Sequence, residues 1–176
     1  MTTKSSTSLS AHYVRSVCIA LLITFAYCTA VSAGGWNTYK GAWFTIDYPD
    51  RYIVRESLLS NTRSNAYDSV FFRSELGGIE FYVFSPQWGG RPRDVEIQPA
   101  NEYLISHRVK STPQSSTHWY TIGDKKRNYV RSYVDRTNSI DHSRVVIGVK
   151  YADYSTYFLS RDKYLRFKKS LRQFSD

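Results

Sequence analysis

The stretch SVFFRSELGGIEFYVFS, residues 69–85, decides the fold class more directly than any other part of the chain. Its two arms, 69–74 and 79–85, are rich in β-branched and aromatic residues, which favour strands. The four residues between the arms end in Gly77 and Gly78, and glycine tolerates the positive φ angles of a tight turn. The stretch therefore predicts a β-hairpin.

A further strand is predicted upstream of the hairpin, from Trp43 to Tyr48. Phe44, Ile46 and Tyr48 occupy every second position, which places their side chains on one face of the strand, directed toward a core. The Pro-Asp pair at residues 49–50 ends the strand.

Downstream of the hairpin, the sequence predicts a loop and then a helix. Residues 86–93 contain several proline and glycine breakers and are expected to form an exposed loop. Pro99 suits the first turn of a helix, and Tyr103, Leu104 and His107 follow at helical spacing. A short amphipathic helix is therefore predicted from Pro99 to about Val109.

The remainder of the chain predicts a meander and a terminal helix. Strands are expected at 118–122, 127–135 and 143–151, joined by polar turns. Ser160 is expected to cap a final helix, because an apolar stripe recurs at intervals of three and four residues. The stripe consists of Tyr164, Phe167, Leu171 and Phe174. The fold class is therefore α+β, with an antiparallel sheet of hairpin and meander packed against a short middle helix and a C-terminal helix.

This order of elements resembles the Mog1/PsbP-like fold. Two motifs carry the resemblance: FTIDYP at 44–49, a strand that ends in a Tyr-Pro turn, and YLRFKKSL at 164–171 in the last helix. Members of that superfamily include a photosystem accessory protein, a nuclear transport cofactor and bacterial envelope adaptors. The resemblance implies a binding or accessory domain rather than an enzyme, although a fold does not by itself choose among such uses.

Residues 1–33 have the features of a cleavable secretion signal. Lys4 and Arg15 make the start of the chain positive, and the apolar run at 17–31 is shorter than the roughly 20 residues of a transmembrane helix. Small residues at 31–33 form a cleavage site. The sequence thus predicts a single domain, 34–176, that is periplasmic or secreted and keeps no transmembrane anchor.

Both cysteines, Cys18 and Cys28, lie inside the predicted signal. The mature domain is therefore expected to contain no disulfide and to depend on its own apolar core.

The formal net charge of the whole chain is +9. Such an excess favours anionic partners, which outside the cytosol include acidic proteins and anionic envelope polymers. Solvated surface charge that keeps the domain soluble is the alternative. Nucleic acid is a weaker candidate partner, which rests on Lys125, Lys126, Arg127 and Arg131.

The predicted mature chain contains no familiar catalytic or metal-binding motif. Its histidines are His107, His118 and His142. Their spacing is not that of a metal site. Asp135, Asn138 and Asp141 place three oxygen-bearing side chains in one turn, where they serve either a hard cation or local turn hydrogen bonds. No cofactor and no metal site are predicted.

Two candidate binding surfaces follow from the pattern of side chains. Tyr129, Arg131 and Tyr133 alternate with valines along one predicted strand, so they form an exposed face if the valines face the core. Tyrosine and arginine are enriched at the energetic centres of interfaces. Cross-strand packing on a solvent-facing sheet is the alternative.

The second surface is the loop that contains Trp88, Arg91 and Arg93. It combines a large aromatic ring with two guanidinium groups, although Trp88 could instead pack onto the domain as a lid.

These features favour a non-enzymatic binding or accessory domain that recognises a protein or an anionic envelope polymer. An inhibitor or immunity-type protein is one version of this hypothesis. The alternative is a cell-wall or carbohydrate-active enzyme whose carboxylates meet only in the fold.

Overall fold

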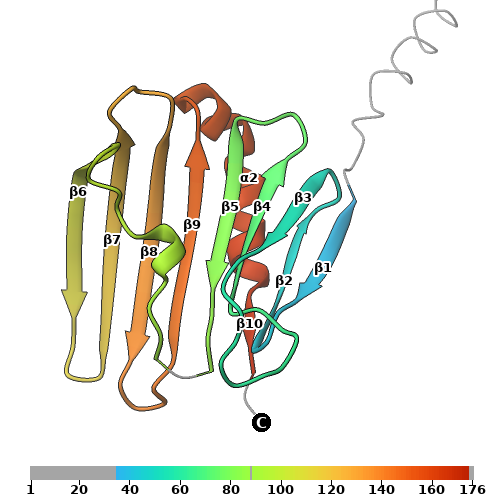
Figure 1. Ribbon diagram of the computed structural model, residues 1–176, viewed down its shortest axis with the longest axis vertical. Coiled ribbons are helices and arrows are strands. Elements are labelled where there is room, and N and C mark those ends of the chain that lie inside the picture. Colours follow the sequence, from blue (N-terminus) through green and yellow to red (C-terminus); the bar gives the residue numbers. More distant parts are fainter. Residues whose placement is uncertain (1–34, 88, 175–176) are drawn as a thin grey trace, which may run out of the picture. The chain divides into compact units, whose positions relative to one another are not determined.

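The computed structural model describes residues 35–87 and 89–174 (Figure 1). The predicted secretion signal and Trp88 lie outside the described residues. The described elements are β1 (Trp36–Lys40), β2 (Phe44–Pro49), β3 (Tyr52–Glu56), β4 (Ser69–Ser74), β5 (Ile79–Phe84), the 3-10 helix η1 (Arg93–Val95), β6 (Glu102–Ser111), β7 (Ser115–Asp124), β8 (Val130–Asn138), β9 (Arg144–Tyr151), α2 (Tyr154–Ser170) and β10 (Arg172–Gln173).

The strands form two antiparallel sheets, and the α+β class is confirmed. The larger sheet has seven strands in the order β3-β4-β5-β9-β8-β7-β6, and the smaller has three in the order β1-β2-β10. The predicted hairpin is β4–β5, and Gly77 and Gly78 in its turn both have a φ of 74°. The predicted meander is β7–β8–β9, in which β7 is longer than expected and β8 is shifted toward the C-terminus.

The main core lies between one face of the larger sheet and a layer that contains α2 and β2. Figure 1 shows α2 passing behind β4 and β5. Phe167 of α2 is fully buried, and its ring packs against Phe72 and Phe81 of these strands at centroid distances of 5.3 and 5.1 Å. Phe44 and Ile46 of β2 are also fully buried, which confirms the predicted core-facing side of that strand.

A second, smaller core occupies the opposite face of the same sheet. Successive residues of a strand point to opposite faces, so Phe72 enters the main core and Phe71 enters the second one. Val95 of η1 packs into this second core and is itself buried. The chain between β5 and β6, whose first part was expected to be an exposed loop, therefore folds back over the sheet and covers this face.

The predicted helix from Pro99 to Val109 is wrong, because this segment contains the strand β6. Leu104 pairs with Ile122 and Ser106 pairs with Thr121, so the register shifts at Ile105. This β-bulge separates residues of one face by three positions instead of two. Spacing of that kind imitates a helical period, which explains the error.

The terminal helix begins earlier than predicted. α2 starts at Tyr154, and the Asp153 carboxylate caps it by accepting a hydrogen bond from the Thr156 amide at 2.8 Å. In these first turns Phe158 is exposed, while Tyr157 packs against the main core and extends the stripe of Tyr164 and Phe167 toward the start of the helix. Phe174 lies beyond the helix, where its ring packs against Trp43. Within the described part of the chain, no helix combines the length and apolar character needed to cross a membrane.

Candidate binding site

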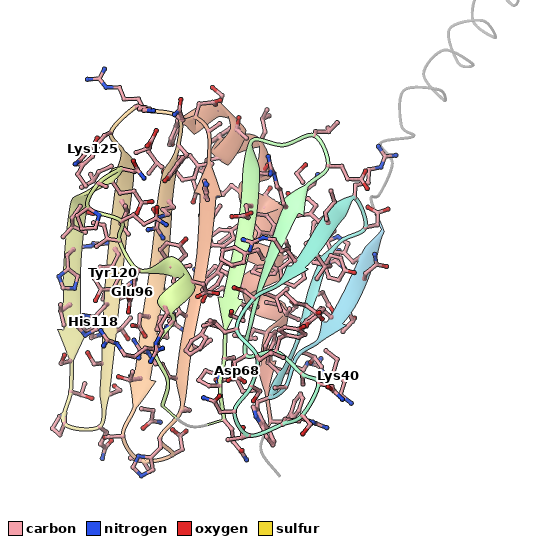
Figure 2. All side chains as sticks on the ribbon, in the orientation of Figure 1. Lys40, Asp68, Glu96, His118, Tyr120 and Lys125 are labelled. Carbon is pink, nitrogen blue, oxygen red and sulfur yellow. The ribbon has the colours of Figure 1, made fainter. Side chains whose placement is uncertain are left out.

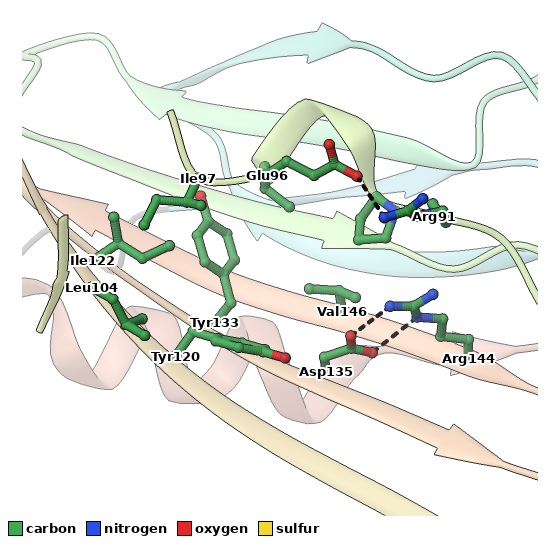
Figure 3. Close-up of a pocket in the computed structure, with 12 residues that line it drawn as sticks. Arg91, Glu96, Ile97, Leu104, Tyr120, Ile122, Tyr133, Asp135, Arg144 and Val146 are labelled. Atoms are coloured by element: carbon green, nitrogen blue, oxygen red, sulfur yellow. Dashed lines mark hydrogen bonds and ion pairs between the residues drawn. The ribbon is translucent and has the colours of Figure 1, made fainter. Parts of the chain in front are cut away.

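A cavity of about 310 Å³ lies between the segment that carries η1 and the face of the larger sheet (Figure 3). Residues 91–97 form one wall, and strands β6 to β9 form the other. The lining residues are Arg91, Pro92, Val95, Glu96, Ile97, Leu104, Tyr120, Ile122, Tyr133, Asp135, Arg144 and Val146. Most of them are apolar or aromatic, so the cavity is suited to an apolar group.

Residues 91–97, which include η1 and are called the covering segment below, are held on the sheet by Asp94. Its carboxylate accepts hydrogen bonds from the Ser69 hydroxyl at 2.6 Å and from the Tyr82 hydroxyl at 2.7 Å. Burial and the adjacent Asp94 charge raise the pKa of Tyr82 well above its ordinary value, so this hydroxyl remains a donor. The covering wall is therefore anchored to β4 and β5.

Arg131 makes the second anchor, from β8. Its guanidinium donates to both carboxylate oxygens of Glu102, at 2.7 Å from Nε and 2.5 Å from Nη2. It also donates to the backbone carbonyls of Val95 at 2.9 Å and Glu96 at 3.1 Å. Such two-pronged pairing is among the strongest that arginine forms. The pair joins β6, β8 and the covering segment at one point.

The protonation states around this pair favour the charged form. Burial alone would raise the pKa of Glu102, but hydrogen bonds from Arg131, the Gln98 amide and Tyr129 outweigh it and lower the pKa below its ordinary value. Burial and the hydrogen bond to Glu102 raise the pKa of Tyr129 to about 12. Glu102 is consequently an acceptor and Tyr129 a donor at neutral pH.

The prediction that Tyr129, Arg131 and Tyr133 form an exposed face is wrong. The alternation along β8 is as expected, but the side opposite the valines is covered by the segment between β5 and β6. Arg131 and Tyr133 are only 5% and 6% exposed. Arg131 serves as an anchor and Tyr133 lines the cavity. The Tyr129 hydroxyl donates a hydrogen bond to the Glu102 carboxylate at 2.8 Å.

The charged residues of the lining form two ion pairs, visible in Figure 3. Arg144 donates to both oxygens of Asp135, at 3.0 and 2.6 Å, and also to the carbonyl of Gly90. Arg91 and Glu96 form a looser, exposed pair at 3.6 Å. The four charges thus neutralise one another in pairs.

Of the two described loop residues predicted to bind a partner, Arg91 lines the cavity and Arg93 does not. Arg93 belongs to η1 and is exposed outside the lining. Trp88 lies outside the described residues. The fold therefore brings Arg91 and Tyr133 into one site, supported by Arg131 and Tyr129.

Both carboxylates of the lining, Asp135 and Glu96, are paired with arginines. General acid or base catalysis requires a carboxyl group that exchanges a proton with the substrate. Asp135 is held by both prongs of Arg144, and Glu96 contacts Arg91. The arrangement instead favours contact with an uncharged, apolar group.

Two of the histidines meet in the fold. Nε2 of His107 lies 3.1 Å from Nδ1 of His118, and the His107 ring stacks on Tyr120 at a centroid distance of 4.5 Å. Figure 2 shows His118 and Tyr120 close together on β7. No cluster of three or more metal-ligating side chains occurs among the residues that the structure describes.

The oxygen-bearing residues of the β8–β9 turn have separate partners. Asn138 accepts from the Ile140 amide at 2.9 Å, and Asp141 accepts from the Ser143 amide at 3.0 Å. Asp135 pairs with Arg144 instead. These contacts are those of the turn alternative.

Several residues of the site could not be identified from the sequence. Asp94 and Glu102 carry no motif, and their partners are far along the chain. Arg144 could have been found in part, since it and Asp135 flank the turn between two predicted strands and become diagonal neighbours, with Asp135 opposite Val146 and Arg144 opposite Thr137.

Asp68 is a buried carboxylate outside the cavity (Figure 2). It is 9% exposed, and its Oδ1 has no hydrogen-bond partner in the described chain. Burial raises the pKa of Asp68, and a hydrogen bond with Ser60 offsets part of this effect. The folded state therefore holds the proton to higher pH than the unfolded state does, and stability falls as pH rises from the ordinary pKa of 3.8.

We expect Asp68→Asn to raise the free energy of unfolding at pH 7 by about 1 to 3 kcal/mol, because the neutral amide removes the cost of burying a charge. Because Asp68 is protonated in both states at low pH, the gain should disappear as pH falls below 3.8. Urea unfolding at several pH values measures it. Asp162→Asn, at an exposed position of α2, is the control. A gain that grows on acidification would contradict the assignment.

Comparisons with known proteins bear on the fold. No protein-family model matches the chain, and no curated protein matches it. Among solved structures, it is similar to cyanobacterial PsbP from Synechocystis, with 12% identity, 84% of this chain and 97% of that chain covered, and a TM-score of 0.45. The Ran-binding protein Mog1p of Saccharomyces cerevisiae has 5% identity, 80% and 96% coverage and a TM-score of 0.42. A Mog1 mutant has 7% identity, 81% and 96% coverage and a TM-score of 0.41.

Proposed function

We propose that this chain is an exported, non-enzymatic binding domain whose cavity receives an apolar side chain of a protein partner. An inhibitor or immunity-type protein is one form that this function takes. The observation that carries the proposal is the lining of the cavity, in which apolar walls lie beside charges that are already paired.

The lining favours a protein over an anionic envelope polymer as the partner. An anionic polymer requires unpaired cations, whereas both arginines of the lining face carboxylates. A cavity of about 310 Å³ is at the lower end of the usual size of ligand pockets. It suits one aromatic or branched side chain, and such buried anchors supply most of the affinity of an interface.

Export rests on the sequence features of residues 1–33. The exported protein should begin at Gly34, which mass spectrometry of the protein recovered from outside the cytosol tests directly. A species that retains Met1 would contradict export by cleavage.

A variant that fills the cavity tests the binding function. Ile97 lies on the covering wall and is 40% exposed, so Ile97→Trp should fill the cavity at little cost to the fold. Leu76→Trp makes a similar change at a turn position that is 96% exposed. Each protein is used to capture partners from an envelope extract. Wild type and Leu76→Trp should retain a protein partner. Ile97→Trp should retain at least about tenfold less of it, as expected when one buried anchor is lost.

Two results would contradict the proposal. One is equal retention of the same polypeptides by Ile97→Trp and Leu76→Trp. The other is retention of polysaccharide without protein, which would favour the envelope-polymer alternative.

A further inference from the structure

The outer edge of β6 is an open strand edge. β6 stands at the end of the seven-strand order and pairs with β7 alone among the described strands (Figure 1). All nine residues after Glu102 are exposed. The backbone amide and carbonyl groups on the outer side of such a strand are a template for another extended chain.

The usual protection of an edge is incomplete here. Natural proteins shorten, bend, charge or cover their edge strands. The bulge of β6 lies near its start, between Leu104 and Ser106, and the register from Ser106 to Ser111 is regular. Six regular residues offer an edge about 20 Å long.

The two faces of this edge differ in chemistry. Arg108 and Lys110 lie on one face, where the Arg108 guanidinium is 5.7 Å from the centre of the Trp119 ring. His107 and Val109 lie on the other face, where His107 stacks on Tyr120. Residues 103–123 contain no aspartate or glutamate, and the acidic residues of β6 and β7, Glu102 and Asp124, lie at the far end of the pair from Arg108 and Lys110. One face of the edge is therefore cationic, and the other carries Val109 beside the stacked rings of His107, His118 and Tyr120.

These charges argue against a second copy of this chain as the occupant. Antiparallel pairing of two β6 edges would bring Arg108 and Lys110 of both copies onto the same face. Like charges in neighbouring strands destabilise the pairing. A strand with acidic side chains would instead be attracted by Arg108 and Lys110.

We propose that β6 accepts an extended segment of an acidic protein by β-strand addition, with acidic side chains facing Arg108 and Lys110 and apolar side chains facing His107 and Val109. Backbone hydrogen bonds supply affinity in this mode, and alternate side chains supply specificity. The inference rests on the proposed function only in taking the partner to be a protein, and it uses the backbone edge of 106–111, next to the part of the cavity that Leu104 and Tyr120 line.

A synthetic ten-residue peptide in which glutamate and valine alternate is the probe. It should bind the full-length protein and slow amide hydrogen exchange at every second residue of 106–111. A peptide of the same composition with five glutamates followed by five valines should bind at least about tenfold more weakly, because it cannot present one kind of side chain to each face. The alternating peptide with N-methyl groups on every second amide should not bind, because the backbone N–H donors along one edge of the peptide are removed.

Charge reversal supplies the matched variants. The double variant Arg108→Glu, Lys110→Glu should bind the alternating peptide with an affinity lower by about tenfold or more. Lys163→Glu with Lys169→Glu makes the same change in net charge at exposed positions of α2 and should leave binding nearly unchanged. Equal binding of the block or N-methylated peptide would overturn strand addition and would identify a general polyanion surface instead.

Ile97→Trp separates this inference from the proposed function. Peptide affinity should be the same with the cavity filled. If Ile97→Trp abolished peptide binding, the peptide would occupy the cavity, and the edge proposal would fail while the cavity proposal stood. If the peptide bound to the edge but Ile97→Trp retained its captured partner, the cavity proposal would fail instead.

Discussion

Arg131→Ala is expected to destabilise the folded protein by about 3 to 5 kcal/mol, the typical effect of removing one partner of a buried ion pair. The Glu102 side chain is 3% exposed and would be left as a buried charge without its guanidinium. The carbonyls of Val95 and Glu96 would lose a donor at the same time. Urea unfolding at pH 7 measures the loss.

The pH dependence of this loss has a definite sign. The pKa of Glu102 is lowered in the folded wild type, so its contribution to stability is present above the ordinary value of 4.5 and is lost as pH falls through the lowered value. The gap between wild type and Arg131→Ala should therefore narrow on acidification below 4.5. Arg161→Ala, which removes an exposed arginine, should change stability little. Similar losses for both variants would contradict the anchoring role.

Phe167→Ala is expected to cost about 3 to 5 kcal/mol, because it removes a fully buried ring and leaves a cavity between α2 and the larger sheet. Leu171 only packs against the edge of this core, so Leu171→Ala should cost less. Phe158→Ala is the matched control, since Phe158 lies on the same helix and is 65% exposed. Thermal or urea unfolding measures all three. Equal stability of Phe167→Ala and Phe158→Ala would mean that α2 does not seal the core.

The sequence predicted those parts of the fold whose signals are local. The β4–β5 hairpin follows from two strand-forming arms around Gly77 and Gly78, and the core face of β2 follows from simple alternation. β6 was mistaken for a helix because its bulge changes the spacing of one face. The predicted start of α2 is too late because the sequence offers two residues suited to an N-cap, and Asp153 rather than Ser160 is the cap.

The candidate site was predicted in part, for a physical reason. Arg91, Arg131 and Tyr133 were singled out by residue type, and all three lie at or beside the cavity. Arg131 and Tyr133 are buried rather than exposed, because the covering segment lies over them. Contacts between residues far apart in the sequence hold that segment in place. The bond from Ser69 to Asp94 and the pair of Arg131 with Glu102 join positions 25 and 29 residues apart, which no local pattern records.

Titration with N-acetylphenylalaninamide, followed by NMR of the methyl groups, tests the central claim that the cavity receives an apolar side chain. We expect the largest shifts at Ile97, Ile122 and Val146, which line the cavity. The same shifts should appear in Leu76→Trp and should be lost in Ile97→Trp, where the cavity is filled. Shifts that persist in Ile97→Trp, or that fall on residues outside the lining, would contradict the claim.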